Sequence, residues 1–340
     1  MTVGEPLIEA IDLTKTYPVR RRQRSLLAAL RSRFFERPQM VLALDQLNFS
    51  LRAGEMVGLI GANGAGKSTT IKLMTGILHP SSGTVRVFGK DPTEERRRNA
   101  YRFGVVMGQR SHLWWDLPAF DSFELYRRMY SVSRHDFTQT MAMLSELLDL
   151  HEFIDTPVRQ LSLGQRMRCE LASALIHRPS VLFLDEPTIG IDVLAKANIL
   201  SFIRRINTEW QSTVLITTHN LNDLEKLVSR IVIIDRGKLV YNGALDELKR
   251  LGTERQIDIV LREPVDQVVA PGTRVVRVSP YKLSVFVQAG EASVRDVASA
   301  LMQNYPVADI VIQEADIETI VRKIYEAGAV EVETLEQVGA

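Results

Sequence analysis

A glycine-rich stretch at residues 61–69 constrains the fold of this chain more than any other part of its sequence. It reads GANGAGKST and fits the pattern G-x-x-x-x-G-K-[ST], with an apolar run at 56–60 before it and a helical pattern after it. The glycines let successive backbone N–H groups point inward around phosphate oxygens, and the following helix adds the positive end of its dipole. A glycine-rich turn without a ligand is the alternative, but every fixed position of the pattern is filled. The stretch therefore predicts a phosphate-binding loop.

Two side chains of this loop have predicted chemical roles. Lys67 is placed to reach the β- and γ-phosphates of a nucleotide, and the hydroxyl of Ser68 is placed to ligate Mg²⁺. The remaining contacts to the phosphates are expected from Gly61, Asn63, Gly64, Gly66 and Thr69. The loop thus predicts a nucleotide with Mg²⁺, and the use of that nucleotide has to be inferred from the rest of the chain.

The composition indicates a soluble protein of two domains. A chain of 340 residues is long for one domain, and 45% hydrophobic with 24% charged residues is ordinary for soluble proteins. The net charge of +1 creates no global field toward nucleic acid, so no nucleic-acid partner is expected. The single cysteine, Cys169, excludes an internal disulfide and suits a reducing compartment.

The sequence shows neither a signal peptide nor an apolar run near the ~18 residues of a membrane helix. We therefore expect a cytoplasmic protein, whose membrane role, if it has one, is supplied by partner subunits.

Two patterns of elements follow one another along the chain. Up to about residue 250, short apolar strands alternate with helices, which predicts a doubly wound α/β core that binds ligands at the carboxyl ends of its strands. From 251 to 340 the chain reads as short alternating strands with two helices and carries no catalytic pattern. We interpret residues 1–250 as the nucleotide-binding domain and 251–340 as a small accessory α+β domain for regulation or dimerisation.

A basic segment at residues 19–40 interrupts the first domain. It holds seven arginines and one acid, Glu36, and some of its leucines recur at helical spacing. One interpretation is a solvated surface helix, and the other is a helix that lies near the membrane surface or against a membrane partner. The sequence leaves both open.

Three polar residues follow apolar strands and are candidates for catalysis. Asp185 ends the run at 181–184, where a phosphate-loop ATPase places the acid that holds Mg²⁺, and Glu186 comes next and could polarise a water. A structural cap on the following turn is the alternative for these acids. His219 follows another apolar strand, so it is expected at the same edge of the sheet.

Residues 161–165, Leu-Ser-Leu-Gly-Gln, complete a resemblance to the ATPase subunits of ABC transporters. The usual signature of that family is Leu-Ser-Gly-Gly-Gln, and here it stands in order with the phosphate loop, Gln109, Asp185-Glu186 and His219. The resemblance covers about residues 7–250. It implies a P-loop NTPase core of the ABC type, a helical signature subdomain at about 110–168, and ATP with Mg²⁺ as the ligands.

The resemblance also implies roles for single residues. Glu186, His219 and Gln109 are expected to be catalytic, with Ser68, Gln109 and Asp185 around Mg²⁺. Tyr17 resembles the aromatic residue that stacks on adenine. The groups that contact the ATP of a second copy, or the interface beside it, are expected to be Ser162, Gly164, Gln165 and Asp192. Leu163 departs from the usual glycine, which leaves ATP binding intact but puts the tightness of closure in question.

These expectations imply an assembly at the membrane. A homodimer would hold two equivalent ATP sites, and a membrane permease would contact it near Trp114 and Trp115, with the 19–40 segment as a further contact. The alternative for the two tryptophans is one ring in the core and one half-exposed. The pattern around them and the long tail resemble the exporter branch that pairs with small six-span permeases, on the cytoplasmic face of the membrane.

Other functions are weighed against that one. An importer ATPase would share the same cassette, with a regulatory C-terminal domain. A soluble ABC ATPase acting on ribosomes or DNA usually has two cassettes, a long coiled coil or zinc-binding cysteines, which this chain lacks. A phosphate-loop kinase outside the family does not explain residues 161–165 or His219.

Overall fold

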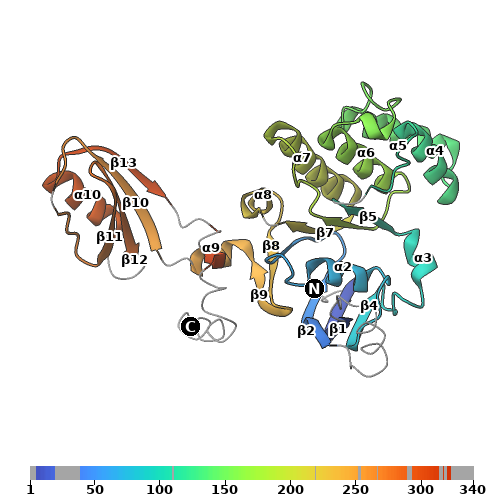
Figure 1. Cartoon of the computed structure of the whole chain (residues 1–340), viewed down its shortest axis with the longest axis horizontal. Helices are drawn as coiled ribbons and strands as arrows, with labels where there is room; N and C mark the ends of the chain where they lie inside the picture. The colour runs from blue at the N-terminus through green and yellow to red at the C-terminus, as the bar shows by residue number, and fades with distance from the viewer. Residues whose placement is uncertain are drawn as a thin grey trace, which may run out of the picture. The chain divides into compact units, whose positions relative to one another are not determined.

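The structure is a computed structural model, and it describes residues 5–19, 39–108, 111–218, 220–251, 254–265, 267–288, 293–313, 317 and 320–322. The chain divides into two compact units, Met1–Asn242 and Gly243–Ala340 (Figure 1). The sequence pattern placed this division near residue 250. Each unit has its own sheet and core and is described by itself.

A six-stranded sheet forms the centre of the first unit. Its strands, in spatial order, are β5 (Phe103–Met107), β6 (Val181–Asp185), β7 (Thr213–Thr218), β3 (Met56–Ile60), β8 (Arg230–Asp235) and β9 (Lys238–Ala244). The pairs from β5 to β8 are parallel. The strands β3 and β7 are buried along their whole length, as their continuous apolar runs predict for a parallel sheet with both faces covered. The α/β class expected from the sequence is confirmed.

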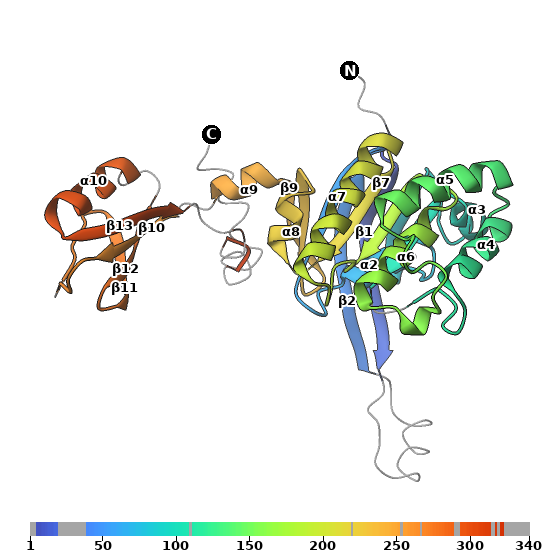
Figure 2. The ribbon, with the colours of Figure 1, turned by 90° about the horizontal axis from the view of Figure 1, so that it is seen from above.

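A smaller antiparallel sheet joins the same core. It contains β2 (Gln39–Leu51), β1 (Ile8–Val19) and β4 (Ser82–Val87) in that order. Buried residues of both sheets, among them Ile8 and Leu59, pack in one hydrophobic cluster. The ends of β1 and β2 project beyond the rest of the unit (Figure 2). The basic segment expected at 19–40 lies between these two ends, and its residues 20–38 are outside the described part of the chain.

Helices lie on both faces of the large sheet, and three of them form a group on one face. The helix α2 (Lys67–Met74) lies between the two sheets, while α4, α5 and α6 gather on the other face of the large sheet (Figure 1). The helices of the unit are α2, α3 (Arg96–Ala100), α4 (Ala119–Met129), α5 (Arg134–Leu147), the 3-10 turn η1 (Val158–Gln160), α6 (Leu163–Leu175), α7 (Val193–Trp210) and α8 (Leu221–Glu225). The group α4–α6 spans residues 119–175 and overlaps the helical subdomain expected at about 110–168, an assignment that stays a prediction.

The second unit is a small α+β structure. After α9 (Leu245–Leu251), an antiparallel sheet forms in the order β11-β12-β10-β13, and α10 (Val294–Asn304) packs Val297 and Leu301 on it. The strands are β10 (Glu254–Leu261), β11 (Thr273–Ser279), β12 (Lys282–Gln288) and β13 (Val307–Gln313). The alternating apolar residues of β10 and β12 face the helix, which is the arrangement that their sequence pattern predicts. Within the described ranges, no helix of either unit is both long and apolar enough to cross a membrane.

Candidate functional site

The glycine-rich loop joins β3 to α2, the strand–loop–helix order that its sequence predicts. Gly66 precedes the helix with a φ of 113°, in the left-handed region that favours glycine. A Cβ on this residue would lie 2.7 Å from the carbonyl oxygen of Ala43. Both the backbone conformation and the close approach therefore require glycine at this position of the loop.

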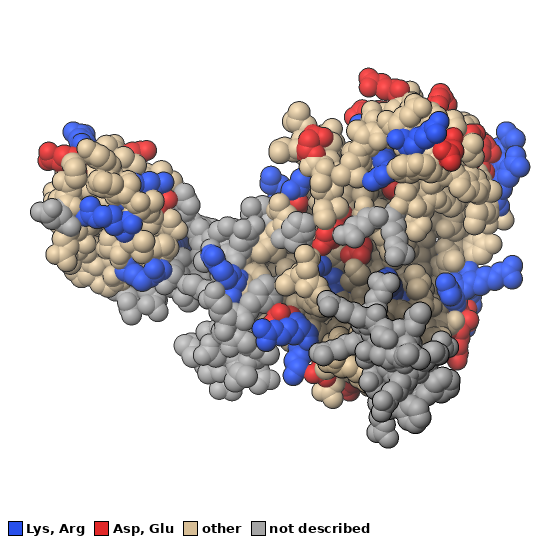
Figure 3. Space-filling view, in the orientation of Figure 1, with Lys and Arg blue, Asp and Glu red and all other residues tan. Residues whose placement is uncertain are grey.

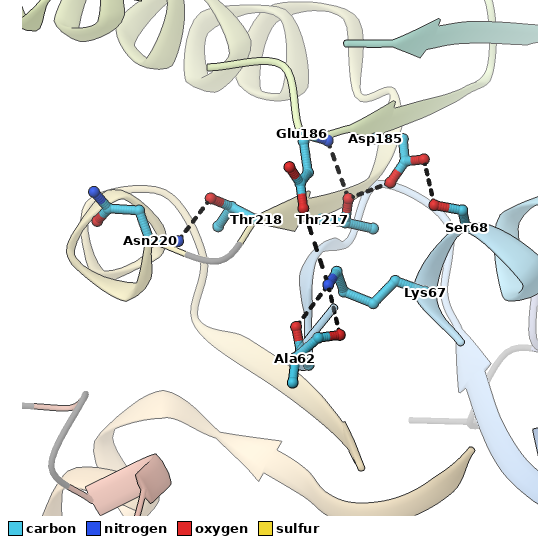
Figure 4. A network of polar contacts seen from close by, with 9 residues as sticks. Ala62, Lys67, Ser68, Asp185, Glu186, Thr217, Thr218 and Asn220 are labelled. Atoms are coloured by element: carbon cyan, nitrogen blue, oxygen red, sulfur yellow. Dashed lines mark hydrogen bonds and ion pairs between the residues drawn. The ribbon is translucent and has the colours of Figure 1, made fainter. Parts of the chain in front are cut away.

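Lys67 is held inside the loop by backbone oxygens. Its Nζ donates hydrogen bonds to the carbonyl oxygens of Gly61 at 2.6 Å and Ala62 at 3.2 Å, and lies 4.0 Å from Oε1 of Glu186 (Figure 4). The side chain is only 6% exposed, and burial lowers the pKa of Lys67, although the nearby Glu186 and Asp185 carboxylates oppose that shift. A partly desolvated ammonium group in this position is prepared to receive an anion.

Asp185 accepts two hydroxyl hydrogen bonds at the end of β6. Ser68 Oγ donates to its Oδ2 at 2.7 Å, and Thr217 Oγ1 donates to its Oδ1 at 2.6 Å (Figure 4). The register explains the second contact, because Asp185 pairs directly with Thr217 between the parallel strands β6 and β7. A hydroxyl and a carboxylate from two elements thus meet beside the loop, and oxygen ligands of this kind suit Mg²⁺.

Glu186 adopts a backbone conformation that is rare for a residue with a side chain. Its φ is 53°, and its N–H donates to both Oγ1 and the carbonyl oxygen of Thr217, at 3.0 and 3.1 Å. A Cβ on Gly108 would lie 2.3 Å from the carbonyl oxygen of Glu186, so only glycine fits beside it. The left-handed backbone turns this carboxylate toward Lys67, and stored strain of this kind concentrates at functional sites.

These residues line one cavity of about 360 Å³. Its lining includes most of the residues predicted from the loop and the two acids, namely Asn63, Gly64, Gly66, Lys67, Ser68, Thr69, Asp185 and Glu186. Gly61 contributes the carbonyl oxygen that holds Lys67. Tyr17 is not part of this lining; it lies on β1, where the Lys15 ammonium is 5.5 Å from its ring. Gln109 and His219 lie outside the described residues.

A second group of predicted residues gathers at the start of α6, away from the cavity lining. Ser162 caps this helix by accepting from the N–H of Gln165, whose side chain accepts in turn from the N–H of Ser162. Gly164 packs beside the loop before α7: a Cβ there would lie 3.9 Å from Oδ2 of Asp192. Leu163 reaches the same loop, and a Cβ on Gly190 would lie 2.8 Å from its Cδ2. The side chain that replaces the usual glycine therefore packs within its own chain.

Asp192 itself caps α7, with its Oδ1 accepting from the N–H groups of Leu194 and Ala195 at 3.1 and 3.0 Å. We expect Asp192→Ala to lower the free energy of unfolding by about 1 kcal/mol, whereas Asp192→Asn, an equally good cap, keeps it. Denaturant titration of both variants measures the difference. Equal destabilisation by Asn and Ala would contradict the capping role. The Asn variant is then tested for dimerisation with ATP. If it is stable but no longer dimerises, Asp192 also acts in the interface.

Trp114 and Trp115 are both half-exposed, at 48% and 51%. The alternative that one of them is a core residue is therefore wrong. Their backbone is fixed: the N–H of Trp114 donates to Ser122 Oγ at 3.1 Å, and the carbonyl oxygen of Trp115 accepts from the N–H of Arg159 at 3.0 Å. Two exposed aromatic rings on a fixed backbone have the character of an interface anchor.

Several residues in the cavity lining or in contact with its acids were not anticipated from the sequence. Thr217 orients both acids, and Gly108 allows the close approach to Glu186. The lining also includes Ala43, Lys72 and Met107. Thr217 could have been found, because it lies near the carboxyl end of β7, an apolar strand of the same parallel sheet. The others gave no signal, since their proximity depends on how β2, α2 and β5 pack.

The fold and the cavity define the class: a phosphate-loop nucleotide-binding α/β protein. The family model described as ABC transporter matches residues 44–189. The ABC transporter ATP-binding protein NatA of Bacillus subtilis is 30% identical over 227 residues, which cover 67% of this chain and 91% of NatA. The chain therefore belongs to the ATP-binding subunits of ABC transporters, a family of ATPases, as its sequence motifs indicated.

The chain is also similar to a second ATP-binding protein and to a solved structure. The Nod factor export ATP-binding protein I of Burkholderia orbicola is 36% identical over 203 residues, covering 60% of this chain and 66% of that protein. A dimeric structure of the ATP-binding cassette MJ0796, in a post-hydrolysis state with ADP and Pi, matches with a TM-score of 0.59 at 23% identity, over 70% of this chain and 98% of that one. The structural match supports the fold.

Proposed function

We propose that this protein is the ATPase subunit of an ABC exporter, in which two copies close around two ATP molecules and reopen after hydrolysis. One observation carries this proposal. Lys67, Ser68, Asp185 and Glu186 converge on one cavity, whereas the signature residues around Ser162 gather elsewhere on the same unit. The signature residues of the same chain do not line this cavity. We therefore infer that the signature residues of a second copy complete the phosphate site.

The residues of the cavity divide the chemistry between them. The Lys67 ammonium neutralises the β- and γ-phosphates, and the N-terminus of α2 adds its dipole to the same anion site. Glu186 accepts a proton from the attacking water, with Thr217 orienting its backbone. Ser68 and Asp185 would hold Mg²⁺, and the ion would supply positive charge to offset the charge that develops on the phosphates. Gln109 and His219 complete the proposed catalytic set, and Tyr17 the adenine contact.

Exposed apolar residues support pairing with a second copy. Val193 and Leu194, directly after Asp192, are 82% and 80% exposed on the first turn of α7. Adjacent apolar side chains exposed to this degree are typical of a surface that a partner covers. We place the second copy here, with its ATP against Ser162, Gly164 and Gln165.

Export is favoured by a relative, and the distribution of charge argues against a nucleic-acid partner. One relative is named for Nod factor export, and it shares 36% of the aligned residues. On the face drawn in Figure 3, basic and acidic side chains of the described residues are interspersed, which gives no field for nucleic acid. We assign the protein to the cytoplasmic face of the membrane, where permease subunits hold it. Residues 1–250 are its proposed ATPase domain, and 251–340 are a proposed accessory domain. An importer ATPase is the second candidate.

The direction of transport tests this assignment. The full chain would be co-purified with the membrane proteins encoded beside its gene and reconstituted in vesicles with the ATPase outside. ATP-dependent accumulation of substrate inside those vesicles supports export. Dependence on a secreted binding protein would instead establish import.

The tryptophan pair is the proposed permease contact. We expect Trp115→Ala to weaken permease binding at least tenfold, because a buried aromatic anchor contributes ~2 kcal/mol or more to an interface. ATP binding and folding should be unchanged, since the ring is half-exposed in the free protein. Co-purification and ATP titration measure the two properties. Tyr101→Ala, another exposed aromatic change, is the control. Unchanged permease binding by Trp115→Ala would contradict the proposed contact.

A further inference from the structure

A buried carboxylate on α6 has no contact with the nucleotide cavity. Glu170 is only 4% exposed, and its oxygens face residues 111–117, which we call the tryptophan segment. Ser111 Oγ donates to Oε1 of Glu170, and the N–H of His112 donates to the same carboxylate at 3.0 and 3.2 Å. Burial raises the pKa of Glu170, and the bond from Ser111 opposes that shift. Burying a carboxylate is unfavourable unless it accepts hydrogen bonds, and the tryptophan segment donates them to Glu170.

The rest of the tryptophan segment is tied to the helical subdomain as well. The hydroxyl of Tyr126 on α4 donates to the carbonyl oxygen of His112 at 2.6 Å. The N–H of Leu113 donates to Ser111 Oγ at 3.2 Å, so the hydroxyl that binds Glu170 also shapes the turn before the tryptophans. The segment thus presents Trp114 and Trp115 on a backbone whose position depends on α4 and α6.

The helix α6 connects two functional regions. Its N-cap is Ser162, the proposed contact with the second copy's ATP, and Glu170 lies eight residues later, or ~12 Å along the axis. Gly108 precedes the tryptophan segment in the chain, and its N–H donates to the carbonyl oxygen of Asp185 at 2.8 Å. Only residues 109 and 110 separate this anchor from Ser111. One short stretch of chain is therefore attached to the hydrolytic acids at Gly108 and to α6 through Glu170.

We propose that Glu170 is a positioning residue that makes the tryptophan segment follow α6 when the composite ATP site closes. The inference rests on the proposed function, because it takes the second copy's ATP to contact Ser162 and the permease to contact the tryptophans. When ATP draws the N-terminus of α6 toward the second copy, the helix moves as a rigid element. The hydrogen bonds at Glu170 carry that movement to Ser111 and His112, and so to the permease surface.

Tryptophan fluorescence of the full chain tests this coupling. The chain has three tryptophans, and Trp210→Phe leaves only Trp114 and Trp115 as reporters. In this background, Glu186→Gln prevents turnover, so that added ATP is expected to give a dimer, seen by light scattering, together with a shift in tryptophan emission. We expect Glu170→Ala to retain the ATP-dependent dimer and to lose the emission shift.

Two further variants separate positioning from stability. Glu170→Gln keeps a hydrogen-bonding group of the same size, so it should restore the shift. Glu124→Gln, the same chemical change at a carboxylate of α4 that pairs with Arg127 at 3.0 Å, should leave the shift unchanged. Should Glu170→Ala fail to fold, Ser111→Ala removes the same contact from the surface side and is expected to reduce the shift.

The outcomes distinguish the two proposals. An ATP-dependent dimer that keeps its full emission shift in Glu170→Ala, or that shows no shift with Glu170 intact, overturns the inference and leaves the proposed function standing. If Glu186→Gln forms no dimer with ATP while Glu170 is intact, the proposed function itself is wrong, and the inference fails with it.

Discussion

Replacing Glu186 by Gln is expected to lower ATP turnover by about 10²- to 10⁴-fold, the usual contribution of a general base. The amide has nearly the same shape as the carboxylate but cannot accept a proton from the attacking water. ATP binding should persist, because Lys67 keeps its contacts with the carbonyl oxygens of Gly61 and Ala62. ATP should then hold two copies of the variant together, since reopening depends on hydrolysis. Phosphate release and light scattering measure the two effects.

The control for this prediction is a change of the same type far from the cavity. Glu209 lies on α7, is exposed, and pairs with Arg205 on the same helix. Glu209→Gln should leave both turnover and the oligomeric state as they are. Normal hydrolysis by Glu186→Gln would show that the catalytic role is assigned to the wrong residue. Loss of ATP binding by the same variant would indicate that its ion pair with Lys67 organises the loop.

The part of this structure that local sequence determines was predictable. The loop at 61–69 is specified by its own glycines, and the apolar runs of β3, β6 and β7 predicted buried parallel strands. Because parallel strands end at one edge of the sheet, the sequence also predicts that Asp185 and Glu186 lie beside the loop. The cavity lining bears out this juxtaposition.

The contacts that depend on tertiary packing were not predictable. Nothing near Gly108 in the sequence indicates that its Cα lies against the backbone of Glu186, or that Glu186 adopts a positive φ. Glu170 occurs within an ordinary helical pattern, and only the fold brings it to Ser111, 59 positions earlier in the chain. In each case the interaction joins segments distant in sequence, so no local pattern records it.

Lys67→Met is expected to weaken ATP binding about 100-fold, because charge-assisted hydrogen bonds to phosphate contribute ~3 kcal/mol at the upper end of their range. Met keeps the aliphatic part of the side chain, so packing around the loop is retained. The matched control is Lys72→Met, on the same helix and beside the same cavity, whose cation has no predicted contact with the β- and γ-phosphates. Equilibrium ATP titration of the two variants measures the difference.

The pH dependence of ATP binding gives this prediction a second readout. Burial lowers the pKa of Lys67 below the ordinary value of about 10.4, so the free protein loses this charge earlier than an exposed lysine does as the pH rises. Because the phosphates interact with the charged form, ATP affinity is complete below the lowered pKa and declines as the pH rises through it. That decline should be absent in Lys67→Met and present in Lys72→Met. If both variants retain the decline, another group causes the loss of ATP affinity at high pH, and Lys67 is not the cation that binds the phosphates.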